Sequence, residues 1–509
     1  MNAVEMRDIT KSFGSVNANR NINFCVREGE IHSLLGENGA GKTTLMNILY
    51  GIYTPTEGTI LIHGNPVVIH SPLEAIANGV AMVHQHFMLV EKMTVAENVV
   101  VNYEPHRGLM FDEQAACKTV EEISSRYGLK VDARARVGDL SVGAKQRVEI
   151  IKALFHKANI LILDEPTAVL TPGEVQDFFC VLQQLRAAGK SIILITHKLN
   201  ETMAIADRVT VLRQGEVVAT LTRDELEVNQ LAEMMVGRHV NLNIARKQLR
   251  ADRPVLMALE NAFLIHRGIH LLDNVSLELR AGEILGIAGV SGNGQTELVE
   301  VLTGIAPLTA GSLILDGEVL TATSPEAMLS RGVGHIAEDR FQRGMVKEFS
   351  VAENLILGYH KSPKFSGRIL MKRKSIHQYA EETVLEYDVR CDGVDGPLGR
   401  LSGGNQQKVV VSRVIRQNPR VIIAAQPTRG VDIGAIEFIH ERLMRMRDEG
   451  KAILLVSAEL DEILQLSDRI GVLYGGKLAA IGPASEFDEI RLGRLMTGQC
   501  DETSEEKSK

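Results

Sequence analysis

Short apolar runs that end in polar residues recur along the chain. Ile31–Leu35, Ile160–Leu163 and Ser191–Ile195 are four or five residues long and rich in Ile and Leu. Runs of this length and content are typical of strands buried on both faces, as in a parallel sheet. This pattern predicts an α/β fold.

Other segments have a different periodicity. Between Phe87 and Leu140 apolar residues recur at helical spacing, for example from Phe111 to Tyr127, which predicts an inserted all-helical subdomain. Residues 207–220 and 468–482 each contain two strand-like runs around a tight turn, Gln214-Gly215 or Gly475-Gly476. These two segments are predicted hairpins.

The chain is an internal duplication. Three blocks return in the same order: VREGEIHSLLGENGAGKTTL (26–45) as LRAGEILGIAGVSGNGQTEL (279–298), LSVGAKQRVEI (140–150) as LSGGNQQKVVV (401–411), and ILILDEPTAVL (160–170) as VIIAAQPTRGV (421–431). Ordered repeats over this length predict two homologous domains. We place them at 1–236 and 255–497, joined by a polar linker at 237–254 and followed by a charged tail at 498–509.

Composition narrows the class of protein. The 509 residues carry a net charge of −8 and are 45% hydrophobic, which excludes a disordered chain and argues against nucleic acid as the main partner. No apolar run approaches the ~20 residues of a membrane helix, and the first residues lack a secretory signal. The five cysteines form no CxxC pair, so we expect reduced thiols rather than a zinc site or disulfides.

The first half contains a complete phosphate-binding loop, the P-loop, directly after the strand Ile31–Leu35. Its glycines let backbone N–H groups approach phosphate, and a helix N-terminus that follows adds positive charge. Lys42 is expected to reach the β- and γ-phosphates of ATP, and Thr43 to bind Mg²⁺. The predicted ATP-binding residues here are Gly36, Glu37, Asn38, Gly39, Ala40, Gly41, Lys42, Thr43 and Thr44.

Two acidic residues end the strand Ile160–Leu163. Asp164 is expected to hold Mg²⁺, and Glu165 to polarise the attacking water. The alternative is that both acids simply cap the helix after Pro166.

Leu401-Ser402-Gly403-Gly404-Asn405-Gln406 resembles the LSGGQ signature of ABC-type ATPases, and Leu140-Ser141-Val142-Gly143-Ala144 is a looser copy. The resemblance covers nearly the whole chain. It implies two tandem P-loop NTPase domains, each with an antiparallel β portion, a RecA-like parallel-sheet core and an all-helical insert. It also implies roles for Gln85 (catalysis and the metal), for His197 (catalysis) and for Phe13, which either stacks on adenine or packs in the core.

In ABC-type ATPases two domains close face to face, so each nucleotide lies between the P-loop of one and the signature of the other. The resemblance therefore implies that Ser402, Gly403, Gly404 and Gln406 bind ATP held by the first P-loop. The second half has lost the charged groups: Gln295 replaces Lys42, Ala425 and Gln426 replace Asp164 and Glu165, and Ala458 replaces His197. We predict one competent site and one degenerate site, the latter made of Gly289, Gly292, Gly294, Gln295, Thr296, Ser141 and Gly143.

This arrangement resembles the fused ATP-binding subunits of bacterial importers for nucleosides and simple sugars. Three strings favour nucleosides: HQHFMLV (84–90), AAQPTRG (424–430) and GNGQT (292–296). The resemblance implies two membrane-spanning permease subunits, an extracytoplasmic solute-binding protein as an indirect partner, and a peripheral location on the cytoplasmic side of the membrane. Phe87–Val90, just after Gln85, either dock on the permease or pack the insert.

Rival functions remain at this point. A ribosome- or DNA-acting ABC protein usually keeps both acid pairs or carries zinc-binding cysteines, which this chain lacks. A regulatory ATP sensor without transport is a third possibility. The sequence leaves open whether the two halves pair within one chain or between two.

Overall fold

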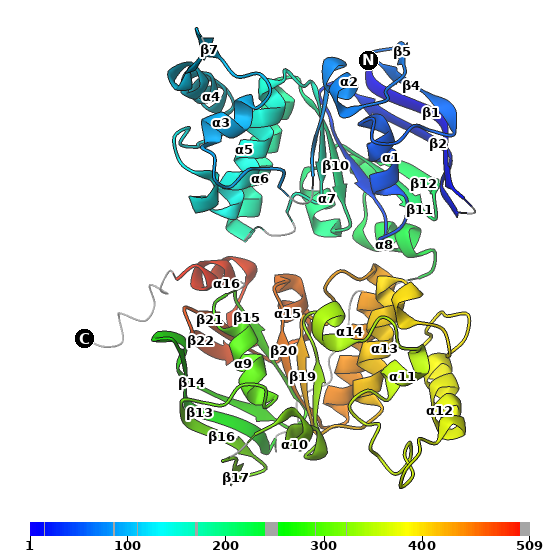
Figure 1. Ribbon diagram of the computed structural model, residues 1–509, viewed down its shortest axis with the longest axis vertical. Coiled ribbons are helices and arrows are strands. Elements are labelled where there is room, and N and C mark those ends of the chain that lie inside the picture. The colour runs from blue at the N-terminus through cyan, green and yellow to red at the C-terminus, as the bar shows by residue number, and fades with distance from the viewer. Residues whose placement is uncertain are drawn as a thin grey trace. The chain divides into compact units, whose positions relative to one another are not determined.

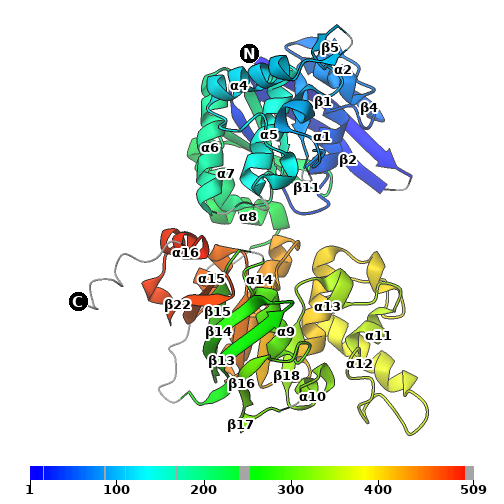
Figure 2. The same cartoon turned by 60° about the vertical axis from the view of Figure 1, so that its left-hand side comes forward.

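The computed structural model describes residues 1–14, 16–84, 87–108, 110–167, 170, 172–239, 253–290, 292–321 and 323–498. The chain divides into two compact units, Met1–Val240 and Asn241–Lys509, drawn in Figures 1 and 2. Most of the predicted linker 237–254 and nearly all of the predicted tail 498–509 lie outside the described residues.

Unit 1 contains two large sheets. An antiparallel sheet has the order β2-β1-β4-β5, and a mixed sheet has the order β12-β11-β3-β10-β9-β6. In chain order the strands are β1 (Asn2–Phe13), β2 (Val16–Arg27), β3 (Ile31–Leu35), β4 (Glu57–Ile62), β5 (Asn65–Val67), β6 (Val80–Val83), β7 (His106–Arg107), β8 (Met110–Phe111), β9 (Ile160–Asp164), β10 (Ser191–Thr196), β11 (Arg208–Arg213) and β12 (Glu216–Thr222).

The predicted parallel core is confirmed. Strands β3, β9 and β10 correspond to the three apolar runs, and β10 pairs in parallel with both β3 and β9. The residues of all three strands are buried. Their carboxyl ends therefore meet at one edge of the sheet, where loops can collect functional side chains.

Both predicted hairpins are confirmed. β11 pairs antiparallel with β12, and Gln214 and Gly215 between them have φ of 51° and 81°. Two positive φ angles are what a type I′ turn requires, and Gly supplies one at no steric cost. In unit 2 the same turn lies at Gly475 and Gly476, with φ of 55° and 77°.

The helices of unit 1 include the predicted insert. Figure 1 shows α3 to α6 on one side of the unit and the antiparallel sheet on the other. The helix expected from Phe111 begins at Glu113, because Asp112 caps it by accepting a hydrogen bond from Ala115 N–H. A short β7–β8 hairpin precedes it. The helices are α1 (Lys42–Leu49), α2 (Pro72–Ala77), α3 (Val95–Val100), α4 (Glu113–Tyr127), η1 (Val137–Asp139), α5 (Val142–Phe155), α6 (Pro172–Ala187), α7 (Leu199–Ile205), η2 (Arg223–Glu225) and α8 (Val228–Val236).

Unit 2 repeats this topology, as the duplication predicts. Its sheets have the orders β14-β13-β16-β17 and β18-β19-β20-β15-β21-β22, the same connectivity as in unit 1. The strands are β13 (Val255–His266), β14 (Ile269–Arg280), β15 (Glu283–Ala288), β16 (Ala310–Leu315), β17 (Glu318–Val319), β18 (Val333–Ile336), β19 (Val421–Ala425), β20 (Ala452–Val456), β21 (Arg469–Tyr474) and β22 (Lys477–Pro483).

The helices of unit 2 occupy the corresponding places. They are α9 (Gln295–Leu302), α10 (Pro325–Ser330), η3 (Arg340–Gly344), α11 (Val351–Leu355), α12 (Arg373–Glu386), η4 (Leu398–Arg400), α13 (Gly403–Ile415), α14 (Ile433–Asp448), α15 (Leu460–Leu466), η5 (Ala484–Glu486) and α16 (Glu489–Met496). None of the helices in the described ranges has the length and apolarity to span a bilayer. The four described cysteines are free thiols, and Cys500 lies outside the described residues.

One ion pair recurs in both units with different burial. Asp207 pairs with Arg186, and Asp468 pairs with Arg447; each aspartate also accepts a hydrogen bond from the first strand of its parallel core, at Ile31 or Ile284. The Arg447 and Asp468 side chains are only 3% and 5% exposed, whereas Arg186 is 45% exposed. The two pairs form a matched comparison inside one chain.

We expect Arg447→Met to lower the free energy of unfolding of unit 2 by about 3–5 kcal/mol, because it leaves a buried carboxylate without its counter-ion. Arg186→Met should lower that of unit 1 by about 1 kcal/mol or less. Hydrogen exchange followed peptide by peptide measures the two units separately. Equal losses in the two variants would contradict this interpretation.

Candidate functional site

The P-loop of unit 1 connects β3 to α1. Gly39 and Gly41 have φ of 84° and 99°, a region that other residues rarely adopt. A Cβ on Gly41 would lie 2.5 Å from the Ala18 carbonyl oxygen. The first helical bond of α1 runs from Leu45 N–H to Gly41 C=O, so the N–H groups of the residues between them lie before the intrahelical ladder and can face an anion.

Lys42 is buried at the start of α1, and its Nζ donates to the carbonyls of Gly36 (2.6 Å) and Glu37 (2.9 Å). Burial lowers the pKa of Lys42, and the negative charges of Glu165 and Asp164 oppose that shift. The P-loop lysine and the acidic pair after β9 are therefore electrostatically coupled, although they are more than 100 residues apart in the sequence.

Asp164 is the last residue of β9 and is buried. Burial, together with the neighbouring Glu165 charge, raises the pKa of Asp164 to about 6, while Lys42 lowers it. A carboxylate in this environment lacks a full complement of positive charge. The site therefore favours binding of a cation.

Glu165 has φ of 45°, a left-handed conformation that costs of order 1–3 kcal/mol in a non-glycine residue. A hydrogen bond from its N–H to Ile195 C=O (3.0 Å) ties this turn to β10. Its Oε1 lies 2.9 Å from His197 Nδ1. This hydrogen bond is the main cause that lowers the pKa of Glu165, so the carboxylate is ionised near neutral pH.

The described residues supply only some of the ligands that Mg²⁺ would need. Thr43, in the first turn of α1, and the under-compensated Asp164 carboxylate offer the hard oxygen ligands that Mg²⁺ prefers, with water completing its shell. The third predicted ligand, Gln85, lies outside the described residues. Within the described ranges no group of three or more His, Cys, Asp or Glu side chains suits a metal ion.

Phe13 ends β1 and is 44% exposed. Its ring meets the edge of Tyr53 at 5.2 Å, and Lys11 Nζ lies 5.1 Å from its centre. This exposure is compatible with stacking on a base and disfavours the core alternative.

The two signatures differ at their first residue. Ser141 caps α5 by accepting a hydrogen bond from Ala144 N–H (3.3 Å). Ser402 precedes α13 but makes no such cap; its Oγ instead accepts from Asn405 Nδ2 (2.9 Å). The first N–H groups of α13 therefore have no side-chain cap and remain available to an anion.

The remaining signature residues show tight packing. A Cβ on Gly404 would lie 2.3 Å from Asp432 Oδ2, and one on Gly143 would lie 2.8 Å from Glu174 Oε1. Gln406 Nε2 donates to Leu401 C=O (2.8 Å). Each glycine thus also serves helix packing.

The second P-loop keeps the backbone and loses the cation. Gly292 and Gly294 have φ of 92° and 106°, like Gly39 and Gly41. Gln295 Nε2 donates to Val290 C=O (3.1 Å), the same loop position that Lys42 bonds at Glu37. The buried Gln295 Oε1 has no hydrogen-bond partner among the described residues, and an acceptor there repels phosphate.

Neutral hydrogen bonds replace the acids of unit 2. Gln426 has φ of 47°, close to that of Glu165, and its N–H donates to Val456 C=O (2.7 Å). Its Oε1 accepts from the N–H of Ala458 (3.2 Å), which stands where unit 1 has His197. The strained turn is retained although its ionisable groups are gone.

A new ion pair lies near the second P-loop. Arg429 Nη1 lies 3.2 Å from Glu338 Oε1, and Thr296 Oγ1 donates to Glu338 Oε2 (3.4 Å). An arginine thus supplies positive charge beside Thr296, the counterpart of Thr43.

Sequence reasoning missed three positioning residues. Gln146 is buried and donates to Pro166 C=O (2.6 Å), which fixes the loop after the acidic pair of unit 1. Gln407 does the same at Pro427 C=O (2.7 Å), after the neutral pair of unit 2. Their recurrence 261 residues apart inside an aligned block was a visible signal. Arg340 donates to Arg429 C=O (2.9 Å) beside the signature of unit 2, and nothing in the sequence pattern indicated it.

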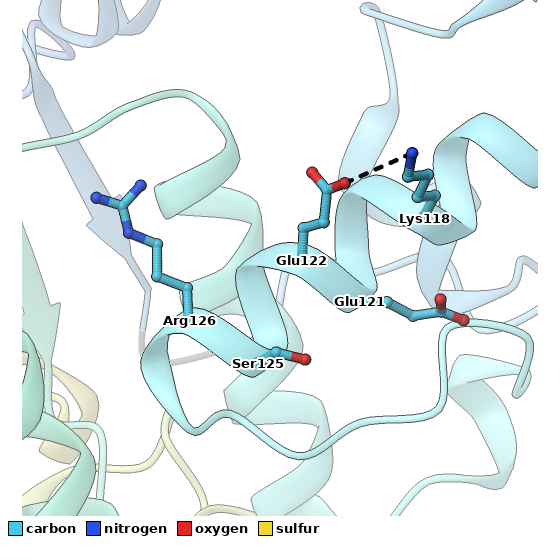
Figure 3. A pocket seen from close by; sticks show the side chains of 5 residues that line it. All are labelled: Lys118, Glu121, Glu122, Ser125 and Arg126. Carbon is cyan, nitrogen blue, oxygen red and sulfur yellow. Dashed lines mark ion pairs between the residues drawn. The ribbon is translucent and has the colours of Figure 1, made fainter.

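The structure thus brings Lys42, Asp164, Glu165 and His197 together at one sheet edge of unit 1. A separate shallow hollow on α4 is lined by Lys118, Glu121, Glu122, Ser125 and Arg126 (Figure 3). It contains none of the predicted site residues, and its Lys118–Glu122 pair is an exposed contact at 3.9 Å.

Comparisons with known proteins show the family of this chain. The family model described as "ABC transporter" matches residues 19–168 and 272–429. The nucleoside import ATP-binding protein NupA of Lactococcus lactis is 46% identical over 97% of this chain and 98% of its own length. The guanosine import ATP-binding protein NupO of Bacillus subtilis is 46% identical over 97% of each chain.

Sugar importers are close behind. The ribose import ATP-binding protein RbsA 1 of Rubrobacter xylanophilus is 42% identical over 97% of this chain and 98% of its own length. Among solved structures, an archaeal ribosome recycling factor covers 97% of this chain, and this chain covers 92% of it, with a TM-score of 0.66 at 18% identity. At that identity the likeness concerns the fold alone.

The raised pKa of Asp164 predicts a pH-dependent stability difference. The pKa of Asp164 is higher in the folded chain than in the unfolded chain, so the folded chain holds this proton more tightly. The resulting contribution to folding stability is fully present below about pH 4 and is lost as the pH rises through about 6. We expect Asp164→Asn to stabilise the ligand-free chain at pH 8 by up to about 3 kcal/mol. Denaturant unfolding of both proteins at several pH values measures this, and a pH-independent difference would sink the interpretation.

Proposed function

The chain belongs to the ABC transporter family and is an ATPase subunit, and from this premise we propose that it powers import of nucleosides through a membrane permease. The observation that carries the ATP-hydrolysing part of the proposal is the charged set of unit 1. Lys42, Asp164 and Glu165 are mutually coupled, and His197 bonds Glu165. Unit 2 has neutral residues at the corresponding positions.

The residues of unit 1 divide the work of hydrolysis. Lys42 and the N–H groups at the start of α1 neutralise and orient the phosphates. Glu165, held by His197, accepts a hydrogen bond from the attacking water, and His197 and Gln85 orient water and the γ-phosphate. Thr43 and Asp164, with Gln85, would hold Mg²⁺, and the ion would supply positive charge to the phosphates.

Unit 2 does not hydrolyse ATP in this proposal. Removing a single group that stabilises the transition-state charge costs ~10²–10³ in rate. In unit 2 the counterparts of all four ionisable groups are neutral: Gln295, Ala425, Gln426 and Ala458. Gln295 Oε1, which has no hydrogen-bond partner within the described ranges, further disfavours a bound phosphate. Unit 2 instead supplies the better signature.

The competent site is then completed in trans. Ser402, Gly403, Gly404 and Gln406 would approach the γ-phosphate held by the P-loop of unit 1, in the same chain or in a second copy. The uncapped N-terminus of α13 supports this role, since N–H groups there can bind an anion. Phe13 would stack on the adenine.

The transported solute is proposed from the relatives. Two nucleoside or guanosine import proteins at 46% identity favour nucleosides. A ribose import protein at 42% keeps simple sugars as the alternative. The ATPase does not contact the solute, so only transport can decide.

The partners are proposed to be two permease subunits and, indirectly, an extracytoplasmic solute-binding protein, with this chain peripheral on the cytoplasmic face of the membrane. Met88 and Val90 are exposed, while their backbones are held by Glu149, Asn98 and Lys152. A fixed loop with outward apolar side chains suits docking of a permease helix.

Ser402→Arg should lower steady-state ATP hydrolysis at least 100-fold, because the large cation blocks the N-terminus of α13. Ser141→Arg, its matched control, should change the rate far less, since it lies in the degenerate pair. Phosphate release by the purified chain with its permease measures both. Retained hydrolysis in Ser402→Arg would overturn pairing in trans.

Uptake tests the solute and the catalytic residue together. Cells lacking this chain are offered labelled guanosine and labelled ribose side by side. We expect guanosine uptake alone to be lost, to return with the wild-type chain, and not to return with Glu165→Gln. Gln426→Glu, the matched change in unit 2, should complement like wild type.

The outcomes separate the proposals. Loss of ribose uptake alone would show that the solute is a sugar rather than a nucleoside, and it would agree with the proposed import function. Loss of neither would contradict both solutes. Full complementation by Glu165→Gln would contradict its assignment as the catalytic carboxylate.

A further inference from the structure

The loop that leads into α12, residues 360–374 and called here the basic loop, has an unusual composition. It contains six Lys or Arg residues and no Asp or Glu, in a chain whose net charge is −8. Three consecutive apolar residues, Ile369, Leu370 and Met371, lie in its middle. Figure 2 shows this loop at the outer edge of unit 2, next to α12.

The basic loop has a buried anchor. Phe365 is buried, and its ring meets that of Tyr379 on α12 at 4.9 Å. Backbone hydrogen bonds from Lys372 N–H to Phe365 C=O and from Gly367 N–H to Leu370 C=O, both 2.8 Å, close the tip. The tip is therefore a defined turn that holds its side chains outward.

The apolar residues of the tip are exposed. Ile369 is 92% exposed, Leu370 78% and Met371 47%. Contiguous exposed apolar residues ringed by polar ones mark an interaction site. Their neighbours here are cations: Arg368 before them and Lys372, Arg373 and Lys374 after them, all exposed.

The cations also stand at an unfavourable place. Lys372 is the N-cap of α12 and makes no side-chain cap, and Arg373 and Lys374 begin the helix. A helix N-terminus carries partial positive charge and favours acids. Within the described residues Arg368, Arg373 and Lys374 form no ion pair. A local rule broken without compensation in the fold indicates a functional site.

Unit 1 offers the opposite arrangement at the same point of the repeat. There Asp112 is the N-cap of α4 and Glu113 is its first residue, at the places that Lys372 and Arg373 take in unit 2. Met110, two residues before that N-cap as Leu370 is before Lys372, is 78% exposed. Exposed apolar side chains thus occur in both units, but in unit 1 Met110 has one cation, Arg107, as its cross-strand partner and acids after it, whereas in unit 2 cations lie both before and after the tip.

We propose that the tip of the basic loop inserts into the headgroup region of a bilayer that contains anionic phospholipid. Exposed Ile, Leu and Met side chains partition into the boundary between headgroups and acyl chains, and adjacent Lys and Arg bind the negative surface. Among possible occupants, an anionic membrane surface matches both the apolar tip and its charge. This inference does not depend on which solute is carried.

Tryptophan fluorescence provides a direct test, because the chain contains no Trp. Leu370→Trp places a single reporter at the tip, and Met110→Trp places one at the matched exposed position of unit 1. The full chain is mixed with vesicles of phosphatidylcholine alone or with about a third phosphatidylglycerol. We expect a blue shift only for Leu370→Trp, only with anionic vesicles, and weakened by salt.

Charge removal gives the second arm. Each basic residue near an anionic surface contributes roughly a factor of five in affinity. The combined change Arg368→Gln, Arg373→Gln and Lys374→Gln, made with Leu370→Trp, should therefore weaken vesicle binding on the order of 100-fold. The midpoint temperature of thermal unfolding should not fall, since these side chains are exposed.

Three results would overturn the proposal. One is the absence of any shift for Leu370→Trp with anionic vesicles. Another is an equal shift for Met110→Trp. The third is loss of transport in Leu370→Ser with vesicle binding equal to that of wild type, which would assign the tip to a protein partner instead.

Discussion

The site depends on mutual compensation of charge at one edge of a buried sheet. Strands β3, β9 and β10 are fully buried, and the groups that follow them include one cation and two carboxylates. In such a low-dielectric place no single charge is stable alone. Lys42 donates hydrogen bonds to carbonyls of its own loop, and Glu165 is hydrogen-bonded to His197. The negative charge of Asp164 is only partly balanced by Lys42. This excess of negative charge favours a cation at the edge, as the raised pKa of Asp164 indicates.

Unit 2 shows that the fold does not need these charges. It has the same sheet order, the same glycine conformations and the same left-handed turn after its strand β19. Gln295 donates to a carbonyl of its own loop, as Lys42 does. Gln426 accepts a hydrogen bond from Ala458, which stands at the position of His197, the partner of Glu165. Neither glutamine carries a charge. The backbone geometry of this domain thus does not depend on ionisable side chains at the site.

Much of this was predictable from the sequence, for identifiable reasons. Ile31–Leu35 and Ser191–Ile195 are strands because burial on both faces leaves a continuous apolar run, and the turns at Gln214-Gly215 and Gly475-Gly476 follow from backbone preference. The Arg429–Glu338 pair and the unpaired Gln295 Oε1 were not predictable. They depend on side chains 91 positions apart in the sequence or on an absent partner, which no local periodicity encodes. The helix begins at Glu113 rather than at the predicted Phe111, because Asp112 caps it. The apolar pattern alone does not show this cap.

The left-handed turn at Gln426 has a consequence for the duplication. A non-glycine residue at φ of 47° is retained by a bond to Val456 C=O even though no ionisable group there uses the geometry. The backbone geometry around the acidic pair of unit 1 is therefore repeated in unit 2. One backbone thus holds ionisable side chains in one half of the duplication and neutral ones in the other.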